Sequence, residues 1–178
     1  MEEEVLFEET QRFTQKWIWI LLIAIVVFVS GPTIVGFVKQ LFLGQPFGNK
    51  PISNIGLLML TIFNIVIPAI PIYLFAFMKL ETFVKKEGIY VRFFPFVMKD
   101  KFYGWNDLNQ CYVRQYNPAG EFGGWGMRGF GKNRALNVSG NMGIQLETKD
   151  GYRMLIGTNK PQEVEEILRK LKQYVGNG

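Results

Sequence analysis

The chain has 178 residues, with 20 Lys and Arg against 15 Asp and Glu and a formal net charge of +5. It contains no histidine and a single cysteine, Cys111, which excludes a histidine-dependent catalytic triad, the usual zinc sites and an intramolecular disulfide. The carboxylates are scattered without a pairing typical of a catalytic centre, so we expect no enzymatic activity and no metal or cofactor.

The first 16 residues are acidic, with five Glu and only two basic residues. A secretory signal peptide has a basic leader and a small-residue cleavage site, and neither is found here. We therefore predict an acidic cytoplasmic N-terminus over residues 1–16, followed by a membrane span that is retained rather than cleaved.

Two long uncharged runs follow, Trp17–Val38 and Pro51–Met78. About 20 apolar residues cross a hydrocarbon core of about 30 Å, so each run is long enough for a membrane-spanning helix. We predict spans at about 17–38 and 55–77, within a two-span transmembrane hairpin over residues 17–78. Neither run contains Asp, Glu, Lys or Arg, which argues against a transport site between the spans.

Basic residues flank the two runs unevenly. The ends that carry the termini have Arg12, Lys16, Lys79, Lys85 and Lys86, whereas the connecting loop has Lys39 and Lys50. Because basic flanking residues are retained on the cytoplasmic side, this distribution predicts a multi-pass protein of the cell membrane with both termini in the cytoplasm.

Residues 79–178 are basic and long enough to form a domain with its own core. Stretches rich in β-branched and aromatic residues on either side of Glu87-Gly88 predict a hairpin. Asp150-Gly151 separates two further alternating stretches, which is among the strongest hairpin signals. Further strands are expected at residues 102–105, 108–116 and 137–139.

From Pro161 the spacing of apolar residues changes from 2 to 3.6, which indicates an amphipathic helix. The apolar stripe consists of Val164, Ile167, Leu168, Leu171 and Val175. One such helix after six or seven antiparallel strands predicts a mainly-β, pleckstrin-homology (PH)-like barrel that is capped by a C-terminal α-helix. The expected fold class is therefore a membrane α-helical hairpin plus a PH-like barrel over residues 79–178.

Several short motifs support this interpretation. They are Glu87-Gly88-Ile89-Tyr90, Trp105-Asn106-Asp107-Leu108, Glu121-Phe122-Gly123-Gly124-Trp125-Gly126, Asn137-Val138-Ser139-Gly140 and Leu155-Ile156-Gly157-Thr158. With them, nearly the whole chain resembles small bacterial membrane proteins that carry two N-terminal spans and a bacterial PH-like domain, mostly without assigned function. The resemblance implies a fold and a membrane location, and it brings neither a catalytic residue nor a ligand.

The segment Gly120–Gly131 contains six glycines. It formally matches a dinucleotide fingerprint and comes close to a phosphate-binding loop, but no helical pattern follows and Asn133 lacks the hydroxyl that the loop requires. Two interpretations remain open: a glycine-bent connection between strands, or a surface for a partner or an anionic membrane. The residues of that surface would be Phe122, Trp125, Arg128, Phe130, Lys132 and Arg134.

Three further bases, Lys85, Lys86 and Arg92, flank the first predicted hairpin, where phosphoinositide-binding PH domains carry basic residues. The leading hypothesis is a noncatalytic, membrane-anchored binding or scaffolding module that docks another membrane protein or a second copy of itself. The alternative is a peripheral sensor of anionic lipid headgroups that uses these three bases and the glycine-rich segment. We expect no nucleic-acid partner, because the bases are dispersed and membrane attachment accounts for them.

Overall fold

The computed structural model describes residues 4–171, and these form two compact units. One unit is Thr14–Ala76, and the other combines the segment that ends at Phe13 with the segment that begins at Phe77. The second unit is therefore assembled from two parts of the chain that the first unit separates.

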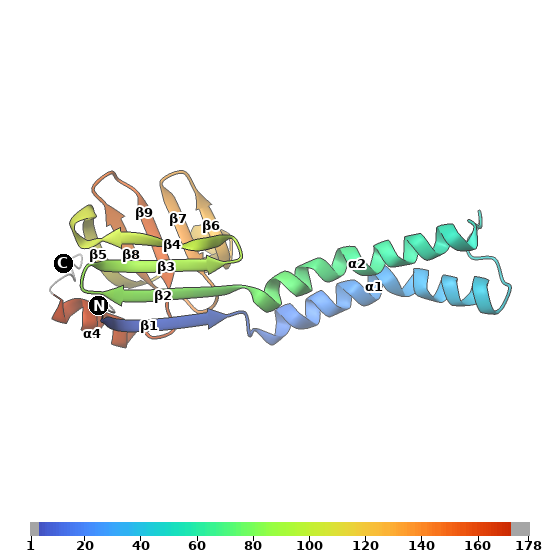
Figure 1. Ribbon diagram of the computed structural model, residues 1–178, viewed down its shortest axis with the longest axis horizontal. Coiled ribbons are helices and arrows are strands. Elements are labelled where there is room, and N and C mark those ends of the chain that lie inside the picture. The colour runs from blue at the N-terminus through green and yellow to red at the C-terminus, as the bar shows by residue number, and fades with distance from the viewer. Residues whose placement is uncertain (1–3, 172–178) are drawn as a thin grey trace. The chain divides into compact units, whose positions relative to one another are not determined.

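The unit Thr14–Ala76 consists of two long helices that lie side by side, α1 (Lys16–Phe42) and α2 (Asn54–Phe77) (Figure 1). Both are long and apolar enough to cross a membrane, and they coincide with the two predicted spans. Most of their large apolar side chains are exposed. Small polar residues connect them: the Ser30 hydroxyl donates to the Asn64 carbonyl at 2.6 Å and the Thr61 hydroxyl to the Thr33 carbonyl at 3.3 Å.

The first sheet of the other unit has four antiparallel strands in sequential order (Figure 1). They are β1 (Val5–Arg12), β2 (Lys79–Lys85), β3 (Gly88–Phe94) and β4 (Val97–Gly104). Strands β2 and β3 form the hairpin predicted at Glu87-Gly88. Strand β1 pairs with β2, with Arg12 opposite Lys79. The acidic segment 1–16, which the sequence analysis separated as an N-terminal piece, therefore contributes a strand to this sheet.

The inward face of β1 explains why no strand is predicted there. Its buried residues are Phe7, Glu9 and Gln11, of which only Phe7 is apolar. The alternation of apolar and polar residues that marks a half-buried strand is therefore missing. The hydrogen-bond partners of Glu9 and Gln11 come from a distant part of the chain, residues 157–159.

The second sheet has five strands in the order β5-β8-β9-β7-β6. Their bounds are β5 (Leu108–Gln115), β6 (Gly126–Phe130), β7 (Asn133–Asn137), β8 (Met142–Thr148) and β9 (Arg153–Gly157). Neighbours are antiparallel except β7 and β9, which run parallel. Strands β8 and β9 form the hairpin predicted at Asp150-Gly151. A 3-10 turn, η1 (Trp105–Asp107), connects the first sheet to the second.

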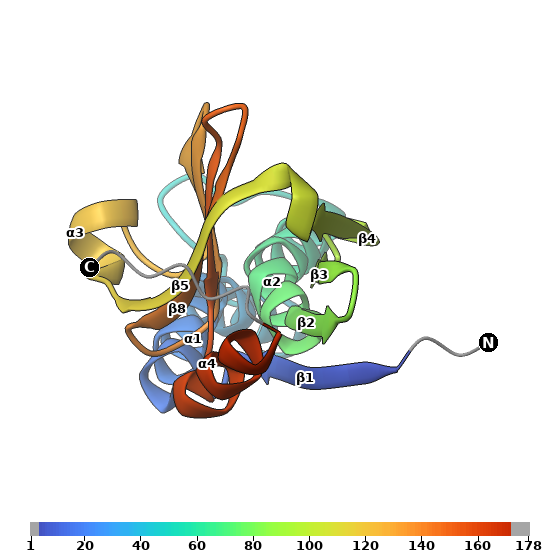
Figure 2. The same ribbon diagram turned by 90° about the vertical axis from the view of Figure 1, so that its left-hand side faces the viewer.

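Helix α4 (Pro161–Lys170) begins at the predicted residue and follows the last strand. It contacts β1 of the first sheet and β5 and β8 of the second (Figure 2). Its Val164 and Leu168 are fully buried, together with apolar residues of both sheets such as Phe93 and Ile144. Val175, the last residue of the predicted apolar stripe, lies outside the described residues.

The prediction of a single barrel with six or seven antiparallel strands is corrected by this arrangement. The described residues form nine strands in two separate sheets, one pair of strands is parallel, and the sheets do not close into a barrel. Two of the additional strands lack the usual sequence signal, since β1 has polar residues inward and β6 lies in the glycine-rich segment, where strand propensity is low.

Candidate binding surfaces

The glycine-rich segment folds into a short helix, α3 (Pro118–Phe122), and the strand β6. The Asn117 side chain caps α3 by accepting a hydrogen bond from the Gly120 amide at 3.0 Å. At Gly129 the backbone has φ of +85°, and a Cβ atom there would collide with the backbone of Asn133 on β7. Some of the glycines are therefore required by the local backbone geometry. This agrees with the interpretation of the segment as a connection between strands.

Two of the predicted contact residues are half-buried and form contacts within the protein. The Phe122 ring packs edge-on against Tyr116, with 6.1 Å between ring centroids, and contacts the cluster that contains Ala135 and Leu155. The Trp125 indole donates a hydrogen bond from Nε1 to the carbonyl of Gly140 at 3.0 Å. These side chains stabilise the fold around the hairpin that β6 and β7 form.

The exposed apolar side chains of this hairpin are Phe130 and Met127. Phe130 is 95% exposed and Met127 is 53% exposed. A groove of about 590 Å³ beside them is lined by Phe122, Met127, Arg128, Phe130 and Arg134, together with two glycines. The hairpin therefore combines apolar and cationic side chains on one surface, which we call the hairpin surface.

The three predicted cations of this region are each held by a backbone carbonyl. Arg128 donates from Nε to Trp125 at 2.8 Å, and Arg134 donates from Nε to Gly131 at 3.2 Å. Lys132 donates from Nζ to Asp150, in the β8–β9 turn, at 3.0 Å. Neutral carbonyls fix these side chains without cancelling their charges.

The bases of the first hairpin have partners in their own sheet or next to its strands. Lys86 forms an ion pair with Glu4 at 2.7 Å, and the Lys85 ammonium lies 4.9 Å from the centroid of the Tyr90 ring. The Arg92 guanidinium lies 2.7 Å from the carboxylate of Glu81. The structure therefore does not gather these bases into a single open site.

The Glu81 carboxylate is nearly buried, and it lies between Arg92 and Lys79. Burial by itself would raise the pKa of Glu81, but hydrogen bonds from Lys79 and Arg92 outweigh this effect and hold the pKa below its usual value. The hydrogen bond to Glu81 correspondingly raises the pKa of Arg92. Arg92 is thus engaged in a structural ion pair.

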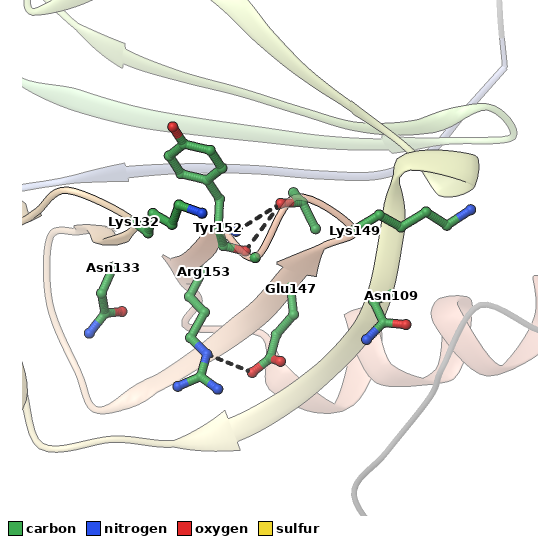
Figure 3. Close-up of a pocket in the computed structure, with 9 residues that line it drawn as sticks. Asn109, Lys132, Asn133, Glu147, Lys149, Tyr152 and Arg153 are labelled. Carbon is green, nitrogen blue, oxygen red and sulfur yellow. Dashed lines mark hydrogen bonds and ion pairs between the residues drawn. The ribbon is translucent and has the colours of Figure 1, made fainter.

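A second hollow region lies at the β8–β9 turn, and two of its cavities have volumes of about 430 and 360 Å³. Figure 3 shows residues that line the larger cavity, with Lys132, Tyr152 and Arg153 near one another. Arg153 lies 3.3 Å from the Glu147 carboxylate, and the Lys132 ammonium is 5.5 Å from the centroid of the Tyr152 ring. Thr148, Tyr152 and Arg153 line both cavities.

The smaller cavity also reaches the first sheet, through Lys101 and Tyr103 of β4. Tyr103 is only 8% exposed, and its hydroxyl has no hydrogen-bond partner among the described residues. Burial raises the pKa of Tyr103 to about 12, so the hydroxyl keeps its proton. Lys101 lies over the Tyr103 ring at 5.2 Å, and burial, followed by repulsion from Arg134, lowers the pKa of Lys101.

Sequence reasoning does not find the residues of this smaller cavity. Lys101 and Tyr103 lie on β4, whereas Arg134 and Arg153 come from β7 and β9 of the other sheet. Of these residues only Arg134 is predicted as a contact residue. No pattern in the sequence indicates that these four residues lie together, because their side chains meet only through the packing of two sheets.

Residues 4–171 contain no group of three or more His, Cys, Asp and Glu side chains that could hold a metal ion. Cys111 is buried on β5, and burial raises the pKa of its thiol to about 12. The thiol therefore remains protonated near neutral pH and is a poor nucleophile or metal ligand.

Comparison with protein families matches residues 1–172 to one model, described as a family of unknown function, DUF6141. The chain belongs to the DUF6141 family. The match covers both long helices and every described strand, so the family model includes the membrane-type helices as well as the sheets. No curated protein and no solved structure matches this DUF6141 chain. The resemblance to PH-like proteins therefore stays a prediction.

Proposed function

We propose that this DUF6141 chain is a noncatalytic, membrane-anchored binding module that docks another membrane protein through the hairpin surface. The observation that carries the proposal is the exposure of Phe130, which is 95% exposed beside the half-exposed Met127. Large apolar side chains that are exposed together on a domain surface are typical of protein contact sites. Aromatic residues of this kind often dominate the binding energy of an interface.

The position of β6 supports docking of an extended segment. It is the last strand in its sheet, and none of the described strands pairs with its outer side. An open edge strand can pair its free N–H and C=O groups with a strand of another protein. The adjacent groove of about 590 Å³ can receive a side chain of that segment.

Charge on the hairpin surface favours an acidic partner. Arg128 and Arg134 line the groove, and each is held by a backbone carbonyl of its own hairpin. Side chains that are already ordered lose less conformational entropy on binding.

The anchor in this proposal is the pair α1 and α2, as membrane spans with both termini in the cytoplasm. The distribution of flanking bases supports that orientation. Two largely antiparallel sheets with a C-terminal helix support a PH-like relationship, although the order of the strands departs from a simple barrel. The alternative function, sensing anionic headgroups through Lys85, Lys86 and Arg92, has less support because each of these bases already has a partner in the sheet or next to its strands.

Photocrosslinking of the full chain in its native membrane tests the proposal. A benzoylphenylalanine at position 130 is compared with one at Phe102, a half-exposed aromatic position on β4. We expect a discrete adduct with another protein from position 130 only, and its loss when Arg128→Glu is added. An adduct of twice the chain mass would instead establish self-association, and adducts with lipid alone would favour the headgroup sensor.

A further inference from the structure

The smaller cavity at the β8–β9 turn contains an unsatisfied polar group. Tyr103 is 8% exposed and lines this cavity, and its hydroxyl has no partner among the described residues. A buried hydroxyl without a hydrogen bond costs free energy, and such groups are uncommon in folded proteins. The cavity of about 360 Å³ that Tyr103 lines could hold a group that accepts a hydrogen bond from this hydroxyl.

Positively charged side chains line the same cavity. Lys101 comes from the same strand as Tyr103, and Arg134 and Arg153 come from β7 and β9. Asp150 also lines the cavity, so the cations exceed the carboxylates. Arg153 is partly balanced by Glu147, at 3.3 Å, which leaves Lys101 and Arg134 as the main uncompensated charges.

We infer that this cavity binds a phosphate group, with Tyr103, Lys101 and Arg134 as its ligands from two different sheets. All three side chains can donate hydrogen bonds, and phosphate oxygens are acceptors that can meet several donors at once. A negatively charged phosphate is also opposite in sign to the net positive charge of the side chains that line the cavity. The group could belong to a lipid headgroup or to a free phosphate compound, since both present the same oxygens.

This site is separate from the hairpin surface that is proposed for docking, although Arg134 borders both. The bound group would connect β4 of the first sheet to β7 of the second. Its binding should therefore stabilise the contact between the sheets, and a rise in the unfolding temperature is the direct readout.

The experiment uses the full chain in detergent micelles and inorganic phosphate as the probe. Unfolding temperature is measured with increasing phosphate and with chloride at the same ionic strength. We expect phosphate to raise the unfolding temperature and chloride not to do so. Glycerol phosphate, and nanodiscs that contain phosphatidic acid or only phosphatidylcholine, then distinguish a free phosphate compound from a headgroup.

Two variants identify the ligands. Tyr103→Phe removes only the unpaired hydroxyl, so the fold should be at least as stable, whereas phosphate affinity should fall about tenfold or more. Lys101→Gln should also weaken binding, and Lys99→Gln is its matched control because Lys99 is on the same strand and lines neither cavity. Equal stabilisation by phosphate and chloride, equal effects of the two lysine variants, or unchanged affinity in Tyr103→Phe would overturn the site.

Discussion

Gln11 donates a hydrogen bond from Nε2 to the carbonyl of Gly157 at 2.7 Å, although 146 residues separate them in the chain. Next to this bond, the buried Glu9 carboxylate accepts hydrogen bonds from the Thr158 hydroxyl at 2.6 Å and the Asn159 amide at 2.8 Å. The polar face of β1 therefore satisfies the backbone and side chains between β9 and α4. Strand β1, which precedes the first long helix, therefore fixes the connection between β9 and α4 near the end of the domain.

We predict that Glu9→Ala strongly destabilises the domain. The change leaves the buried Thr158 hydroxyl and the partly buried Asn159 amide without their acceptor, and hydrogen bonds to charged groups contribute about 1.5–3 kcal/mol each. We expect a loss of about 2–4 kcal/mol in the free energy of unfolding, measured by urea denaturation of the full chain in detergent. Glu8→Ala, at the exposed neighbouring position, should stay within about 0.5 kcal/mol of the wild type. Equal effects of the two changes would show that this network is not stabilising.

Helix α4 should contribute to the free energy of unfolding through its buried face. Leu168 is fully buried, so Leu168→Ala should cost about 2–5 kcal/mol, the usual range for such a change in a core. Lys170 is exposed and forms only a surface ion pair with Glu166, so Lys170→Ala should cost less than about 1 kcal/mol. Urea denaturation of the two variants compares these losses of stability. A small effect of Leu168→Ala would mean that α4 packs loosely.

The Glu81 ion pairs predict a specific dependence on pH. Because the pKa of Glu81 in the folded chain lies below its ordinary value of 4.5, its contribution to stability is present above that pH and is lost as the pH falls through the folded pKa. The wild type should therefore lose more stability than Glu81→Gln as the pH is lowered from 6 towards about 3. Parallel pH profiles of the two proteins would contradict the assignment.

Cys111 should be unreactive until the protein unfolds. With a thiol pKa of about 12 and a buried position, very little thiolate is present at pH 8, and the reagent has no access. Labelling with a disulfide reagent should be slow in the native chain and fast in denaturant, with one thiol counted per chain. Rapid labelling without denaturant would show that β5 opens readily.

Both long helices and two hairpins could be predicted because the signals are local. Uncharged runs mark the helices, and Asp150-Gly151 marks a turn within a few residues of the strands that it joins. Strand β1 could not be predicted in the same way, because Glu9 and Gln11 are polar residues that become buried only when β9 and α4 supply their partners.

The candidate sites were only partly predictable for a related reason. Composition placed Phe122, Trp125 and Phe130 in one group, but the first packs against Tyr116 and the second donates a hydrogen bond to Gly140, so both are half-buried and Phe130 alone of the three is largely exposed. Exposure is decided by the tertiary structure and not by residue type. Lys101, Tyr103 and Arg134 of the smaller cavity meet across two sheets, so no spacing along the chain could indicate them.

The pairing of Arg12 with Lys79 makes α1 and α2 an insertion within a β-hairpin. During synthesis, β1 leaves the ribosome first and cannot pair with β2 until both helices have been synthesised. Completion of the sheet therefore depends on the helices having reached their final topology, and a fragment that starts at residue 79 would expose the edge of β2. Because Arg12 and Lys79 are opposite each other, a short turn in place of residues 13–78 would turn the two strands into an ordinary hairpin and yield the domain without its helices.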